Sequence, residues 1–177
     1  MSNLKHSLIA LLCLLTLAQA AQDLTPASVV CNLNAYVIDP DPKGLNVRSG
    51  PSKTYRVVGT LPHSDSGVIV NVIGAQDNWV LLEKPENLDD TDNKELPKLK
   101  GWVYAPMLGT MTRHPTSGSV KLYQAADAKS RVVSTLAAET EVRLQSCRGG
   151  WAQVKHKQQT GWLAPTAQCG NPVTTCP

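Results

Sequence analysis

The feature that most constrains the fold is an internal repeat. The segment from Leu45 to Leu61 lines up with the segment from Val120 to Leu136 at a constant offset of 75 residues. Both segments contain the pattern Arg-Val-Val-x-Thr-Leu, at residues 56–61 and 131–136. Self-similarity at a fixed period predicts copies of one structural unit, so we expect two similar domains in tandem.

Each copy continues with short stretches in which apolar and polar residues alternate. These are an alternating strand (68–72 and 142–144), a polar turn before a Trp strand (77–82 and 149–154), and a Gly-Trp-apolar segment (101–103 and 161–163). Such runs, separated by Gly, Pro, Asn and Asp, are typical of strands joined by tight turns. No window has a convincing helical period. The chain is therefore predicted to be all-β.

The copies differ most in one spacing. Trp79 and Trp102 are 23 residues apart, whereas Trp151 and Trp162 are 11 apart. The extra residues fall within 83–100, a segment rich in Pro, Asn and charged side chains. We expect an enlarged hairpin loop here, since the entropy of closing a loop grows slowly with its length.

Three segments of the first copy resemble the bacterial SH3 (SH3b) family: Leu-Asn-Val-Arg-Ser-Gly-Pro-Ser at 45–52, Val-Val-Gly-Thr-Leu at 57–61, and Gly-Trp-Val at 101–103. The second copy is similar but diverged, with Tyr123 in place of the family's Arg and Ala125-Ala126 in place of Gly-Pro. The resemblance implies two tandem small SH3-like β-barrels of five or six strands. It also implies a targeting or ligand-binding accessory, often for peptidoglycan or a peptide.

The repeat gives domain boundaries. The expected segments are an N-terminal extension at 21–35, a first SH3b-like domain at 36–110, a linker at 111–118, a second domain at 119–169, and a C-terminal tail at 170–177 that contains Cys176. A domain of about 60 residues buries only about 60% of its unfolded surface. We therefore expect the two domains to pack together.

The first twenty residues have the layout of a secretory signal peptide. Lys5 gives a basic start, residues 8–17 are apolar, and Ala18-Gln19-Ala20 places small residues two apart. This predicts cleavage after Ala20 and a periplasmic or secreted protein. Cys13 does not indicate a lipoprotein, because Leu12 stands where a lipobox has a small residue. The apolar run is also shorter than the roughly 20 residues of a membrane span, and no later stretch is long enough.

Four cysteines follow the signal peptide: Cys31, Cys147, Cys169 and Cys176. An even number in an exported chain favours disulfides, because the compartment outside the cytoplasm is oxidising. Buried free thiols and a zinc site are the alternatives, and the latter is disfavoured by the lack of a Cys-x-x-Cys pair. We expect two disulfides, with all three pairings open.

Charge is distributed unevenly. Residues 21–112 hold 8 Lys and Arg against 11 Asp and Glu, whereas residues 113–177 hold 8 against 3. The C-terminal half is thus suited to attract anionic partners in a salt-sensitive way, unless its basic surface is merely solvated.

No catalytic or metal-binding constellation is evident. The histidines after the signal peptide, His63, His114 and His156, lie in turn-like sequence or between lysines. A Cys-His hydrolase is disfavoured because Cys147 and Cys169 lack a helix start and a neighbouring base. Acidic runs at 39–44 and 90–94 supply too few oxygens for calcium and are interpreted as turns. We expect no enzyme activity, no cofactor and no metal.

The candidate binding residues follow from strand parity. If Val80, Leu82, Ala152 and Val154 fill the core, the tryptophans of the same strands point outward. The candidates are Trp79, Trp151, Tyr55, Arg48, Lys155 and Lys157. Two alternatives stay open. The other domain or the 83–100 insertion covers the tryptophans, and Arg48 bonds to carbonyls of the turn at 49–54 rather than to a ligand.

The leading hypothesis is a non-catalytic exported binding module for peptidoglycan or a peptide in the cell envelope. The alternative is a protein–protein interaction element, such as an inhibitor, an immunity protein or an envelope-sensor component, that binds a folded partner. Neither hypothesis includes nucleic acid as a partner.

Overall fold

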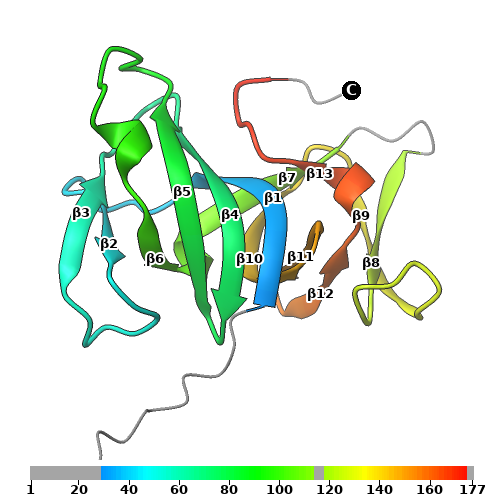
Figure 1. Ribbon diagram of the computed structural model, residues 1–177. Helices are drawn as coiled ribbons and strands as arrows, with labels where there is room; N and C mark the ends of the chain where they lie inside the picture. Colours follow the sequence, from blue (N-terminus) through cyan, green and yellow to red (C-terminus); the bar gives the residue numbers. More distant parts are fainter. Residues whose placement is uncertain (1–28, 114–117, 175–177) are drawn as a thin grey trace, which may run out of the picture.

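The computed structural model describes residues 29–113 and 118–174, and the fold is all-β as predicted (Figure 1). The expected signal peptide, His114 and Cys176 lie outside these residues. The strands are β1 (Val29–Val37), β2 (Leu45–Arg48), β3 (Val57–Leu61), β4 (Val68–Gln76), β5 (Trp79–Asn87), β6 (Gly101–Tyr104), β7 (Leu108–Thr112), β8 (Ser119–Tyr123), β9 (Val132–Ala137), β10 (Glu141–Arg148), β11 (Trp151–His156), β12 (Gln159–Leu163) and β13 (Gln168–Cys169).

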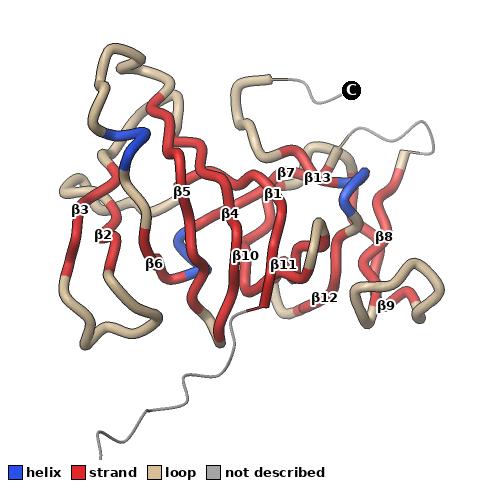
Figure 2. The backbone as a smooth tube through the Cα atoms, in the orientation of Figure 1, coloured by secondary structure: helices blue, strands red, loops and turns tan. Residues whose placement is uncertain are grey.

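Helical structure in the described residues is limited to short 3₁₀ turns (Figure 2). These are η1 (Leu96–Lys98), η2 (Ala105–Met107) and η3 (Pro165–Ala167). A proline near the start of each turn fixes the backbone dihedral that a helical turn needs. None of these segments is long and apolar enough to cross a membrane.

All the strands belong to one antiparallel sheet. Its order is β3-β2-β6-β5-β4-β1-β7-β10-β11-β12-β8-β9, and β13 pairs with β7. The all-β, SH3-like prediction is confirmed, while the barrels are supported only in part, because β3 and β9 end the path without pairing with each other and the sheet is not closed. The two copies share one sheet because β7 pairs with β1 on one side and with β10 on the other.

The two copies repeat the same strand order. β2 to β6 of the first copy correspond to β8 to β12 of the second, and β1 lies beside β4 as β7 lies beside β10. β7 therefore has two roles, because it ends the first copy and begins the second. The extension expected at 21–35 contributes β1 from Val29 onward, and the linker expected at 111–118 begins inside β7.

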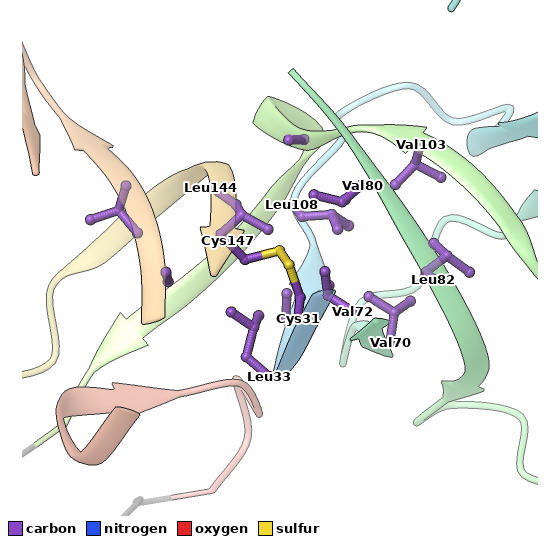
Figure 3. Packing of buried hydrophobic residues seen from close by; sticks show 14 of the residues in the cluster. Cys31, Leu33, Val70, Val72, Val80, Leu82, Val103, Leu108, Leu144 and Cys147 are labelled. Carbon is purple, nitrogen blue, oxygen red and sulfur yellow. A yellow bond between two sulfur atoms is a disulfide. The ribbon is translucent and has the colours of Figure 1, made fainter. Parts of the chain in front are cut away.

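A continuous hydrophobic core runs through both copies. It includes Val47 and Val70 of the first copy and Leu122 and Leu144 of the second. A disulfide between Cys31 of β1 and Cys147 of β10 lies inside this core (Figure 3). Both cysteines are buried, and 116 residues separate them. The expected packing of the two domains is thus confirmed, and one of the open disulfide pairings is resolved.

Polar contacts also join the copies. The backbone N–H of Asn32 donates to the carbonyl of Gly149 at 2.8 Å, and the N–H of Gly149 donates to the carbonyl of Val30 at 2.8 Å. The Tyr36 hydroxyl donates to Glu141 Oε2 at 3.1 Å. Burial, together with the Glu141 carboxylate, raises the pKa of Tyr36 well above its usual value. β1 thus binds the second copy through backbone, side chain and disulfide.

The insertion at 83–100 extends β5 to Asn87 and returns through η1. The Asn93 side chain accepts hydrogen bonds from the backbone N–H groups of Glu95 and Leu96, which starts the 3₁₀ turn. Leu96 is then buried in the core, while Lys100 Nζ lies 3.2 Å from Glu83 Oε2. The insertion is therefore folded onto the first copy.

The acidic run at 39–44 forms turns, as the sequence indicates. The Asp39 carboxylate accepts a hydrogen bond from the backbone N–H of Asp41, whose own carboxylate accepts one from the N–H of Lys43. Gly44 ends the run with a φ of 81°, a conformation that glycine adopts at no steric cost.

Candidate functional site

The outward face of the first copy carries an aromatic pair. Val80 and Leu82 of β5 are fully buried, so alternation turns Trp79 to the opposite face, where it is half-buried. Trp79 lies directly across from Tyr104 of β6, and the centroids of the two rings are 5.8 Å apart at 59°. Trp79 is therefore supported by a neighbouring ring and keeps part of its surface open to a ligand.

Arg48 and Tyr55 lie further along this face. Arg48 is paired with Trp102 on β6, and its Nη1 donates to the Tyr55 carbonyl at 2.9 Å. The Tyr55 ring covers Gly50, where a Cβ would come within 2.5 Å of the ring. Arg48 and Tyr55 thus stabilise the turn before β3. The ring that contacts Trp79 is that of Tyr104.

The second copy has an equivalent face with a different aromatic partner. Ala152 and Val154 of β11 are fully buried, and Trp151 is half-buried on the opposite face. Trp151 meets Tyr123 of β8 edge to face, with ring centroids 5.6 Å apart. β12 lies between β11 and β8, so the pair spans three strands.

Two sequence differences between the copies explain why the supporting ring comes from a different strand in the second copy. Aligning Trp102 with Trp162 places Ala164 at the position of Tyr104, so no ring stands across from Trp151. Tyr123 stands where the first copy has Arg48, and it supplies the ring from β8 instead. Both copies therefore support an outward tryptophan, by different strands.

Lys155 and Lys157 follow Trp151 by four and six residues. A strand rises about 3.3 Å per residue, so Lys155 lies roughly 13 Å from Trp151 along the strand. The two lysines line a groove of about 450 Å³ at the junction between the copies, together with Tyr104 of the first copy. The structure thus brings them toward the aromatic pair of the first copy.

The two described histidines, His63 and His156, lie in separate pockets and do not form one site. His63 is exposed and lines a separate pocket of about 380 Å³ near Tyr36. His156 lies on the second copy, in the groove with Lys155 and Lys157. Cys31, Cys147 and Cys169 are all disulfide-bonded.

Sequence reasoning missed Tyr104, Tyr123 and Arg143 as site residues. Tyr104 is separated from Trp79 by the insertion, which hides the pairing of β5 with β6. Tyr123 carried a signal, because it departs from the residue that the repeat predicts. Arg143 had no signal in the sequence, since its position in the groove depends on how the copies pack.

The comparison with protein families agrees with the fold. The family model described as bacterial SH3 domain matches residues 43–108 and 118–167. No curated protein matches the chain. Among solved structures, the chain is similar to NlpC1 from Trichomonas vaginalis, at 12% identity and a TM-score of 0.31, covering 80% of this chain and 47% of that one. NlpC2 from the same organism is 9% identical with a TM-score of 0.30, covering 80% and 48%.

The present chain spans about half the length of each of these two proteins. The family match is more extensive, because its two segments together cover well over half of the chain and coincide with the two structural copies. The chain therefore belongs to the bacterial SH3 domain family and carries two tandem copies of that domain.

Proposed function

We propose that the protein is a non-catalytic binding module of the cell envelope, and that it recognises peptidoglycan or a peptide through its two outward tryptophan faces. The observation that carries this proposal is the pair of supported tryptophans, Trp79 with Tyr104 and Trp151 with Tyr123. A half-exposed Trp held by a second ring presents a flat apolar surface with a polar N–H group. Such surfaces suit sugar rings, proline rings and methyl groups, and aromatic residues often dominate binding energy.

The disulfides support both the location and the absence of catalysis. A disulfide such as Cys31–Cys147 is typical of proteins in an oxidising compartment, which favours an exported, periplasmic or secreted protein. A cysteine in a disulfide has no thiolate to act as a nucleophile, which argues against a Cys-His hydrolase that uses Cys31, Cys147 or Cys169.

The test is binding to purified cell-wall sacculi from which protein has been stripped. Trp79→Ala and Trp151→Ala should each weaken binding about tenfold, and the double variant should abolish it. Val173→Ala is a matched control, because Val173 is an exposed apolar residue that follows β13, outside the strands that carry the two aromatic pairs. Thermal unfolding of every variant is measured alongside.

Two results would contradict the proposal. One is that both tryptophan variants bind sacculi like the parent. The other is that both variants unfold, which would make the tryptophans part of the packing. Binding to unstripped sacculi alone would favour a folded protein partner.

A further inference from the structure

A groove lined by residues of both copies carries a cluster of positively charged side chains. Its first wall is Tyr104 at the end of β6 and Pro106 of η2, both from the first copy. Its second wall is the outward side of β10 and β11, from the second copy. Arg143 Nη1 donates to the Pro106 carbonyl at 3.2 Å, which ties the two walls together. The groove therefore exists only because the copies are packed together.

Two cations face each other in this groove. Arg143 on β10 and Lys155 on β11 are directly paired in the antiparallel ladder, and both side chains are exposed on the same face. Like charges at directly opposed positions of a sheet destabilise it. Lys157 adds a further cation at the end of the same wall. This arrangement is costly to the fold and suits an anionic ligand.

Among the described residues, no salt bridge joins these cations to a carboxylate. The ion pairs found there, Lys98 with Glu95 and Lys100 with Glu83, both lie in the insertion of the first copy. Glu141 is the acidic residue of the groove, and its carboxylate accepts the hydrogen bond from Tyr36. Arg143 and Lys155 therefore retain N–H donors for an external acceptor.

The aromatic pair of the first copy adjoins the cations. Tyr104 lines the groove and also contacts Trp79, so the outward rings lead directly into the basic wall. A ligand on this surface meets flat apolar groups first and positive charge next. The dimensions fit a short segment, since the groove holds about 450 Å³.

We propose that this inter-copy groove binds the carboxylate of a peptide, held between Arg143 and Lys155, while an apolar side chain of the same peptide lies on Tyr104 and Trp79. The proposal deepens the proposed function, on which it rests, by naming the ligand class and a site that neither copy contains alone. A peptide suits the groove better than a polyphosphate chain, because the Glu141 carboxylate would repel a continuous run of negative charge.

The test uses a matched pair of probes. One is the tetrapeptide acetyl-Ala-Ala-Leu-Ala with a free C-terminal carboxylate, and the other is the same peptide ending in a carboxamide. The affinity of each for the full mature protein is measured by calorimetry, at low and at high salt. The free acid should bind about tenfold more tightly than the amide, and salt should weaken the binding of the acid alone.

Variants of the two cations test where the carboxylate of the peptide binds. Arg143→Gln and Lys155→Gln should each reduce the affinity of the free acid about tenfold, and leave that of the amide unchanged. Lys129→Gln is the control, because it removes the same charge from an exposed turn of the second copy outside the groove. Arg143 and Lys155 are both exposed, so their substitution should leave the fold intact. The midpoint of thermal unfolding of each variant checks this.

The outcomes separate this proposal from the broader one. Equal affinity for acid and amide, an equal effect of Lys129→Gln, or tighter binding of inorganic polyphosphate than of the peptide would overturn the groove site. If Arg143→Gln and Lys155→Gln lose peptide binding while sacculi are not bound, the groove stands and the envelope function falls. If the free acid and the amide bind equally while sacculi are still bound through Trp79 and Trp151, the groove falls and the envelope function stands.

Discussion

The two copies share a strand order but differ in how each supports its outward tryptophan. In the first copy, Trp79 has a ring directly across the β5–β6 ladder. In the second, Trp151 reaches over β12 to Tyr123 on β8. Ala164 and Tyr123 together account for the different support of Trp151. The outward Trp is therefore the common feature of the two faces, while the supporting ring comes from a different strand in each copy.

A first prediction asks whether the copies are one folding unit. The double change Cys31→Ala with Cys147→Ala should lower the free energy of unfolding by about 2–5 kcal/mol, since the disulfide closes a long loop. Because the core is continuous, both copies should still unfold in one transition. Urea titration followed by NMR signals of each copy measures this. Two separate transitions would contradict a shared core, and Val30→Ala, an exposed change in β1, serves as control.

A second prediction compares equivalent glycines. A Cβ at Gly101 would lie 2.6 Å from Val47 Cγ1 and 2.7 Å from the Arg48 carbonyl oxygen, whereas at Gly161 its nearest contacts are 3.0 Å away. Gly101→Ala should therefore cost about 2–3 kcal/mol and Gly161→Ala about 1 kcal/mol. Chemical denaturation of the two variants gives the values. An equal or reversed cost would mean that the β2–β6 contact of the first copy is looser than its geometry indicates.

Much of the fold was predictable because strand parity is local. Val80 and Ala152 are buried and the neighbouring tryptophans face outward, as the alternation indicates. The role of β1 was not predictable, because residues 29–37 lie outside the repeat, and only the tertiary pairing with β4 and β7 defines them. The open sheet has the same origin, since nothing in either copy shows that β7 is shared.

The site was less predictable than the fold. Lys155 has the outward parity expected of it, whereas Lys157 lies in the turn after β11 with a φ of 53°, where strand parity does not apply. Parity also does not give the distance along a strand. Their position near Tyr104 depends on the angle at which the copies pack, to which no single segment of sequence contributes a pattern. Arg48 illustrates a choice between roles that needed coordinates, since its contact with the Tyr55 carbonyl matches the turn-holding alternative.

A third prediction concerns the coupling within each aromatic pair. Double-mutant cycles for Trp79 with Tyr104 and for Trp151 with Tyr123 should each give a coupling free energy of about 0.5–1.5 kcal/mol. The mixed cycle, Trp79 with Tyr123, should give none beyond error. Tyr104→Ala should be partly rescued by adding Arg48→Tyr, which builds the arrangement of the second copy into the first. The absence of rescue would show that the two changes are independent.

The smallest expected effect concerns a loop contact that the first copy has and the second lacks. Asp89, in the insertion, accepts hydrogen bonds from the Ser66 backbone N–H at 3.1 Å and the Ser64 hydroxyl at 2.7 Å. The carboxylate in the short turn between β9 and β10, that of Glu139, lies after β9 and has no such pair of serine donors beside it in the sequence. The bonds from Ser66 and Ser64 lower the pKa of Asp89 from 3.8 to about 2. A carboxyl with a lowered folded-state pKa contributes stability above its unfolded value and loses it as the pH falls toward the folded value. The contribution of the ionised Asp89 to stability should thus be complete above pH 4 and disappear between about pH 4 and pH 2.

Because Asp89 is exposed to solvent, the effect on global unfolding should be small, so the measurement is an NMR titration of the side-chain carboxyl carbon. Ser64→Ala should move the midpoint back toward 3.8, while Ser134→Ala on β9 should leave it unchanged. A parent midpoint near 3.8 would show that the loop of the first copy is no better fixed than the turn of the second.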